Sequence, residues 1–159
     1  MEIKDVFKNR LEGETLTTAL GFIDYLIDKG ITPKKEWDNG FRFILNEKSP
    51  CLVVLTKNAK NIDDWFICDV ADYSNPEWDS LNDDLKKFIL ANIKICSVYE
   101  GDSCGCGSEP GISMNIFGKE YHNLCTSPIQ LIFPQSDVLD KFKEYVEWWI
   151  INIANRCSA

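Results

Sequence analysis

The chain has little histidine, no long apolar run and, over one stretch, no positive charge. His122 is the only histidine among 159 residues, so any mechanism that needs an imidazole must use it. The longest apolar run covers residues 51–55, whereas a membrane-spanning helix needs about 20 such residues. The opening residues, MEIKDVFKNR, are charged throughout and lack the apolar stretch of a secretory signal. We therefore expect a cytoplasmic protein without a membrane segment.

Lysine and arginine are absent from residues 61–85. This stretch carries eight of the 25 acids, and the other 17 acids balance the 17 bases, so the net charge of −8 is concentrated there. The negative electrostatic field of these acids repels phosphate backbones and anionic lipids, which argues against binding to nucleic acid or to a membrane surface. A solvated loop that leads into a helix is the simplest interpretation of the stretch.

Common catalytic and cofactor signatures are missing as well. The sequence contains no HExxH motif, calcium-loop spacing or nucleophile elbow. Gly111 and Gly118 are separated by six residues, too many for a phosphate loop, and Glu120 stands where that loop needs Ser or Thr. These absences favour a non-enzymatic domain that binds a small molecule or a protein partner; an enzyme is the weaker alternative.

The residues that are present suit a single folded domain over 1–159. Hydrophobic residues make up 45% of the chain and aromatic residues 12%. A chain of this length buries roughly two-thirds of the surface that its unfolded form exposes, which is enough for one core. No stretch rich in Pro, Gly or Ser divides the sequence.

Apolar periodicity places the helices. Spacings of three and four predict helical structure from Ile3 to a stop at Gly30. Ser80, with Asp83 three residues later, predicts the cap of a central helix that ends near Ile95. Ser136 is expected to cap the last helix, whose apolar stripe is Leu139, Phe142, Val146, Trp149 and Ile153.

Alternating apolar residues place the strands. Residues 41–45 and 51–56 predict a hairpin around the turn 46–49, and residues 65–70 a third strand. Residues 112–117 and 120–124 predict a second hairpin, and residues 129–133 a further strand. This order lacks the regular alternation of a doubly wound fold. We therefore predict an α+β fold, with an antiparallel or mixed sheet of five to six strands and with N-terminal, central and C-terminal helices packed on it.

The C-terminal helix has a wide apolar face. Trp148 and Ile151 flank its stripe, and a face of that width is costly to leave in water. Burial within one subunit is the first interpretation, and a homodimer contact through this helix is the second.

Four of the seven cysteines form the most specific pattern. Glycines at 105 and 107 give the loop around Cys104 and Cys106 the freedom to gather thiolates, the ligands that zinc prefers. Two ligand sets are open. The first is Cys96, Cys104, Cys106 and Cys125. The second is Cys104, Cys106, Cys125 and His122. A zinc-stabilised module, ordinary free or buried thiols and a reversible disulfide that involves Cys104 or Cys106 are the competing hypotheses.

His122 and Cys125 are also a candidate catalytic Cys–His pair. Side chains three residues apart on a regular strand point to opposite faces, which weakens a Cys–His pair unless the strand has ended. A partly exposed histidine at the end of a hairpin is the favoured interpretation.

Five aromatic residues fall in or beside the predicted strands: Trp37, Phe41, Phe43, Trp65 and Phe66. Core packing is their first interpretation. A small-molecule site over a curved sheet is the second, because strand alternation sends some of these rings outward.

Residues 116–121, 123–125, 104–106 and 83–86, read together, resemble a family of uncharacterised small bacterial proteins that is distantly similar to the YdhG-like group. The resemblance covers nearly the whole chain. It implies a small cytoplasmic α+β domain, and it brings no activity and no catalytic residue with it.

Overall fold

The computed structural model describes residues 2–69, 76–96 and 111–155. In chain order the elements are α1 (Ile3–Lys8), α2 (Gly13–Asp28), β1 (Thr32–Trp37), β2 (Gly40–Leu45), β3 (Lys48–Lys57), β4 (Asp63–Asp69), a 3₁₀ helix η1 (Pro76–Ser80), α3 (Asp83–Ala91), β5 (Ile93–Ile95), β6 (Ile112–Ile116), β7 (Lys119–Ile132), α4 (Ser136–Trp149) and a π-helical turn η3 (Ile150–Ala154).

The fold is α+β, as predicted, and every strand pair of the described chain is antiparallel. The sheet order is β1-β2-β3-β4-β7-β5, with β6 also paired to β7. This gives seven strands in the described residues, so the predicted five to six was too low. Residues 129–133 are not a separate strand, because β7 runs without a break from the hairpin to the partner of β4.

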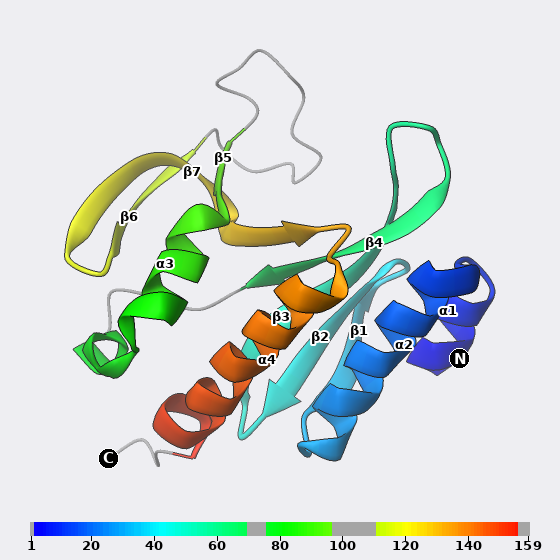
Figure 1. The fold of residues 1–159 in the computed structure, drawn as a ribbon, viewed down its shortest axis with the longest axis horizontal. Coiled ribbons are helices and arrows are strands. Elements are labelled where there is room, and N and C mark those ends of the chain that lie inside the picture. The colour runs from blue at the N-terminus through cyan, green and yellow to red at the C-terminus, as the bar shows by residue number, and fades with distance from the viewer. Residues whose placement is uncertain (1, 70–75, 97–110, 156–159) are drawn as a thin grey trace.

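Helices α1, α2 and α4 lie on one side of the sheet formed by β1 to β4, and α3 lies beside the β6–β7 hairpin (Figure 1). Phe22 of α2 shows how these layers meet. Its ring lies 6.1 Å from the ring of Trp65 on β4 and 5.9 Å from that of Phe142 on α4, measured between centroids. One aromatic side chain therefore joins two helices to the middle of the sheet, where apolar burial stabilises the fold most.

The hairpin between β2 and β3 is tighter than expected. Asn46 and Glu47 have φ angles of +51° and +65°. Two central residues with positive φ are typical of the turn that matches the twist of a two-residue hairpin. The side chain of Asn46 also donates to the carbonyl of Ala154 at 3.0 Å, and Lys48 donates to that of Ile153 at 2.6 Å. The turn thus covers carbonyls at the end of η3.

Both predicted helix caps were wrong by one or two residues. Asn82, not Ser80, caps α3, because its Oδ1 accepts the amide of Leu85 at 2.9 Å. Ser80 instead donates to the carbonyl of Glu77. The residue before α4 is Gln135, and Ser136 is already the first residue of the helix. The central helix also ends early, at Ala91, because residues 93–95 form strand β5 on β7.

The C-terminal helix packs within the chain. Of the predicted stripe, Leu139, Phe142, Val146 and Trp149 are buried, which confirms burial within one subunit for these four, whereas Ile153 is half-buried. Tyr145 is also buried on this helix. Trp148 lies 4.9 Å from Trp78 between ring centroids, whereas Ile151 is 67% exposed. A homodimer contact through this helix stays a prediction.

Candidate functional site

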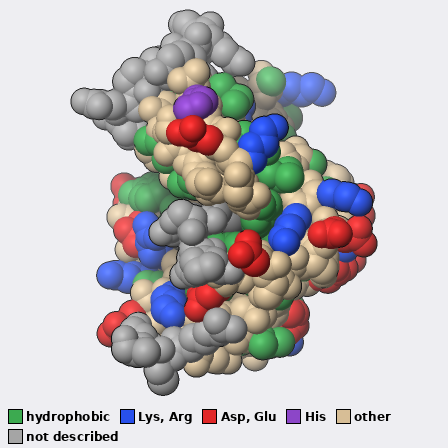
Figure 2. Space-filling view, turned by 90° about the vertical axis from the view of Figure 1, so that its left-hand side faces the viewer, with side chains coloured by type: hydrophobic (Ala, Val, Ile, Leu, Met, Phe, Trp, Pro, Cys, Tyr) green, Lys and Arg blue, Asp and Glu red, His purple; other side chains and the backbone are tan. Residues whose placement is uncertain are grey.

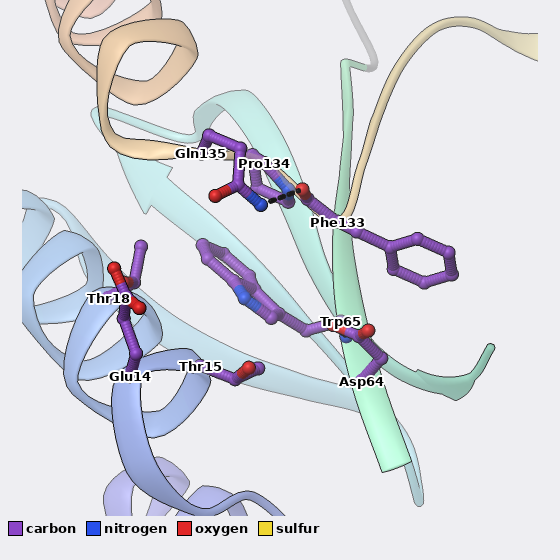
Figure 3. A pocket seen from close by; sticks show the side chains of 8 residues that line it. All are labelled: Glu14, Thr15, Thr18, Asp64, Trp65, Phe133, Pro134 and Gln135. Carbon is purple, nitrogen blue, oxygen red and sulfur yellow. Dashed lines mark hydrogen bonds between the residues drawn. The ribbon is translucent and has the colours of Figure 1, made fainter. Parts of the chain in front are cut away.

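A small polar pocket lies where three distant parts of the chain meet. Its volume is about 190 Å³. Helix α2 contributes its first turns, β4 its first residues, and the connection from β7 to α4 the opposite wall (Figure 3). The lining residues are Glu14, Thr15, Thr18, Asp64, Trp65, Phe133, Pro134 and Gln135.

The indole of Trp65 reaches into this pocket with a free donor. Trp65 is 1% exposed, and its ring extends from β4 toward α2 with the nitrogen on the edge that faces this helix (Figure 3). No described residue accepts a hydrogen bond from that nitrogen, and it is not sealed off as the indole nitrogen of Trp148 is. Solvent in the pocket can accept from this nitrogen in place of a protein group. The pocket therefore presents a donor that a bound molecule can satisfy.

The wall opposite α2 is held by backbone contacts. The amide of Phe133 donates to the carbonyl of Trp65 at 3.1 Å, which fixes the end of β7 against β4. Phe133 has a φ of +51°, an uncommon conformation for a bulky residue. Gln135 Nε2 donates to the Phe133 carbonyl at 3.2 Å. The left-handed residue turns the chain out of the sheet, and this places Pro134 and Gln135 over the pocket.

Asp64 supplies a carboxylate in a fixed position. Its Oδ1 accepts the amide of Trp65 at 2.9 Å, and its Oδ2 accepts Nδ2 of Asn58 at 3.4 Å. The residue is partly buried. Because side chains alternate along β4, this carboxylate lies on the face of the sheet opposite the indole of Trp65 (Figure 3).

Both helices that border the pocket begin without a side-chain cap. The residues before them, Glu12 and Gln135, make no side-chain hydrogen bond to the first turn. Uncapped amides give a helix start a partial positive charge. Each first turn also contains an acid, Glu14 in α2 and Asp137 in α4, which offsets that charge.

The base nearest in sequence to Glu14 is already engaged. Arg10 donates to Asp63 through Nε at 2.8 Å and through Nη2 at 2.6 Å. This paired contact holds the connection between α1 and α2 against the start of β4. Neither Lys nor Arg lines the pocket, so its charged groups are carboxylates alone.

The residues proposed from sequence as zinc ligands lie elsewhere, around β5 and β7. Cys96 is buried, and its amide donates to the carbonyl of Asn123 at 2.7 Å. Cys125 is half-buried, and Gln130 Nε2 donates to its Sγ at 3.3 Å. Cys104 and Cys106 lie outside the described residues. Within 2–69, 76–96 and 111–155, no three His, Cys, Asp or Glu side chains are placed to hold a metal ion.

His122 lies on the surface of the β6–β7 hairpin, where Figure 2 shows it in purple beside an acidic side chain. Its Nδ1 is 2.8 Å from Ser113 Oγ, and its Nε2 is 3.9 Å from Glu120 Oε2. The His122 and Glu120 side chains are 61% and 67% exposed. Water competes for the charges of exposed side chains. Ser113, Glu120 and His122 therefore lack the exclusion of water that strengthens electrostatic interactions in catalytic sites.

A bulge changes the relation between His122 and Cys125. Three residues of β6, from Ile112 to Met114, oppose four of β7, residues 121–124, and Asn123 has a φ of +58°. The extra residue shifts the alternation, so His122 and Cys125 point to the same face of β7. The argument from sequence that separated them was wrong.

The aromatic residues of the strands divide between the two faces of the sheet. Phe41, Phe43 and Trp65 are at most 3% exposed and belong to the main core, which confirms core packing for these three. Trp37 is 47% exposed, and Phe66 packs with a small cluster on the other face.

A search of known protein families, of curated proteins and of solved structures finds no match to this chain. The resemblance to a bacterial family therefore stays a prediction. None of the helices that the structure describes is both long and apolar enough to cross a lipid bilayer.

Proposed function

We propose that the domain binds a small polar molecule in the Trp65 pocket, as a binding module that carries out no chemistry on it. The observation that carries the proposal is the indole N–H of Trp65, which has no hydrogen-bond partner among the described residues and is open to the pocket that its residue lines. A hydrogen bond that replaces one to water contributes only about 0.5–1.5 kcal/mol net. A ligand acceptor placed on this N–H gains a contribution of this size.

The size and lining of the pocket support a ligand of metabolite size. The volume of about 190 Å³ lies below the roughly 300–1,000 Å³ of sites for drug-sized molecules. Thr15, Thr18 and Glu14 of α2 and Gln135 bring hydroxyl, carboxylate and amide groups to the lining beside the indole. Several convergent polar groups fix the orientation of a small molecule better than an apolar cavity of equal size does.

A thermal-shift screen of polar metabolites tests the proposal. A ligand at about 100 times its dissociation constant adds roughly 2.7 kcal/mol to the free energy of unfolding. We expect a hit to stabilise the native protein and to lose most of that effect in Thr18→Val, which removes a hydroxyl from the lining. Thr17→Val is the matched control, since Thr17 lies on the same helix and donates to the carbonyl of Gly13.

Two results contradict the proposal. A hit that stabilises Thr18→Val and the native protein equally binds somewhere else. A broad library that yields no hit leaves the pocket without a small-molecule role. Trp65→Phe adds an independent check, because it removes the N–H and keeps an aromatic ring on Phe22.

The zinc or thiol module is the second candidate. The observation in its favour concerns Cys96 and Cys125, two of the proposed ligands. Cys96 directly follows β5, its amide donates to the carbonyl of Asn123 at 2.7 Å, and Cys125 lies two residues further along β7. Metal bound to the untagged native protein would support this candidate, provided that Cys125→Ser loses the metal and melts at a lower temperature. A metal content far below one ion per chain, together with thiols that titrate freely, eliminates this candidate.

A further inference from the structure

Cys68 of β4 and Cys125 of β7 are brought together on one face of the sheet. We infer that these two thiols form a reversible disulfide by exchange with a small-molecule disulfide such as oxidised glutathione. The pair differs from the one expected from the sequence, which involved Cys104 or Cys106. Both thiols lie on the sheet face opposite the Trp65 indole, so the pair does not depend on the function proposed for that pocket.

Strand alternation places both side chains on this face. The residues just before them, Ile67 and Leu124, belong to the main core, whereas Cys68 belongs to the small cluster on the other face. Successive side chains of a strand point to opposite faces. Cys125 therefore points away from the main core, as Cys68 does.

Gln130 joins the two positions. It lies directly opposite Cys68 in the antiparallel pair of β4 and β7, where the Cβ atoms of partners on one face are about 4.5–5.5 Å apart. Its Nε2 donates to Cys125 Sγ at 3.3 Å and to the carbonyl of Ser127, also at 3.3 Å. The Cys125 sulfur thus contacts the side chain that stands beside Cys68.

A wide bulge in β7 makes this contact possible. Two steps along β5, from Ile93 to Ile95, correspond to five steps along β7, from Ile129 to Leu124. Five extended residues span about 16 Å, which is too far for a glutamine side chain to bridge. The surplus residues of the bulge therefore bring Cys125 close to the part of β7 that pairs with Cys68.

The pKa of Cys68 reflects the same proximity. Burial is the main cause that raises this pKa to about 12, and the charge of a Cys125 thiolate is the next, ahead of the adjacent carboxylate of Asp69. Charges interact more strongly the closer they are. The contribution of Cys125 disappears once Cys125 is in a mixed disulfide, and a hydrogen bond with Ser127 lowers the pKa of Cys68.

Exchange then proceeds in two steps. The thiolate of half-buried Cys125 attacks one sulfur of oxidised glutathione, and one glutathione leaves as a thiolate that takes up the proton lost by Cys125. The Cys68 thiolate attacks Cys125 Sγ in the mixed disulfide, and the second glutathione leaves with the proton lost by Cys68. Two protein thiols are oxidised, and one oxidised glutathione is reduced to two thiols.

Tryptic mapping of the folded native protein after incubation with oxidised glutathione tests the pair. Cys68 is the only cysteine of the tryptic peptide 61–86, and Cys125 is the only cysteine of 120–141, so a link between these peptides identifies the bond. We expect the two peptides to be joined and dithiothreitol to separate them.

Cys68→Ser should stop the exchange after its first step, because no thiol remains to displace glutathione. We expect the glutathione adduct on Cys125 to be at least about tenfold more abundant than in the native protein, since a thiol held nearby has a high effective concentration. Cys68→Ala repeats the test without a buried hydroxyl. Cys125→Ser should leave Cys68, which is 5% exposed, unmodified. Cys96→Ser is the control and should keep the cross-link.

Three results in the native protein overturn the inference, and none of them depends on the folding of a variant. The first is a stable glutathione adduct on Cys125, which would mean that Cys68 does not reach it. The second is a link from Cys125 to the peptide 95–119, which holds other cysteines. The third is a Cys125 that does not react at all while the protein is folded.

Discussion

Arg10 holds Asp63 with two parallel hydrogen bonds, 2.8 Å from Nε to Oδ2 and 2.6 Å from Nη2 to Oδ1. The two residues are 53 positions apart in the sequence. Asp63 is the first residue of β4, immediately before Asp64 and Trp65. A fork-to-fork contact fixes direction as well as distance. This pair therefore aligns the strand that carries the pocket with the connection that leads into α2.

The same pair predicts how stability depends on pH. The hydrogen bond from Arg10 to the Asp63 carboxylate is the main reason that the pKa of Asp63 lies below its ordinary value of about 4. A carboxylate with a depressed folded-state pKa contributes stability that is present above its unfolded pKa and is lost as pH falls through the folded pKa. We expect urea midpoints of the native protein and Asp63→Asn to differ at pH 7 and to converge below about pH 4. Asp38→Asn should not show this convergence; a pH-independent difference in Asp63→Asn would contradict the assignment.

Tyr145 and Asp69 give a second test in the core. Both are 1% exposed, and the tyrosine hydroxyl donates to Asp69 Oδ2 at 3.1 Å. Tyr145→Phe removes one donor from a buried carboxylate, so we expect the free energy of unfolding to fall by about 1–3 kcal/mol. Urea unfolding at pH 7 measures it.

Tyr25→Phe is the matched control for that change. The hydroxyl of Tyr25 donates to the carbonyl of Lys143 at 3.1 Å and to Glu147, whose side chain is 47% exposed. Water replaces a lost donor at an exposed carboxylate, so the loss should be smaller. A loss in Tyr25→Phe that equals or exceeds the loss in Tyr145→Phe would argue against a special cost at Asp69.

Gly40→Ala should displace the indole of Trp37 from its contact with residue 40 without unfolding the sheet. A Cβ at Gly40 would lie 2.2 Å from Cε2 of Trp37, so the indole must move away. Trp37 is 47% exposed and can swing toward water, so we expect a cost of about 1 kcal/mol, at the low end for added volume. Acrylamide quenching of tryptophan fluorescence should increase. Unchanged quenching together with a large loss of stability would show that the ring cannot leave.

Thiol labelling tests the cysteine environments. Burial raises the pKa of Cys68 to about 12 and that of Cys51 well above its ordinary value. At pH 8, roughly one Cys68 thiol in ten thousand is then a thiolate, the reactive form. We expect Ellman's reagent to modify half-buried Cys125 long before these two, with peptide mapping to identify the sites. Rapid modification of Cys51 or Cys68 in the folded protein would contradict their burial.

The fold could be predicted from the sequence where apolar residues alternate or recur every three to four positions. The hairpin of β2 and β3, the β6–β7 hairpin and α4 follow that pattern. Strand β1, with the sequence TPKKEW, was missed because it is an edge strand with mostly exposed side chains and two lysines. Strand β5 was taken as the end of a helix, since Ile93 and Ile95 leave the helix only through pairing with β7.

The site could not be predicted in the same way. Its lining comes from residues 14–18, 64–65 and 133–135, which no local pattern connects. Trp65 was identified as an aromatic residue of the sheet, but strand alternation does not reveal that its ring nitrogen lacks a partner. The turn at Phe133, with a φ of +51°, is equally invisible in a sequence without glycine at that position. Both features depend on tertiary packing.

The most direct test of the central claim is the indole ¹H–¹⁵N spectrum of the protein titrated with a stabilising polar metabolite. Trp149, which is also 1% exposed, provides an internal reference in the core. We predict that the Trp65 resonance moves downfield as its N–H gains an acceptor, while the Trp149 resonance stays in place. A metabolite that raises the melting temperature and leaves the Trp65 resonance unmoved would contradict the account.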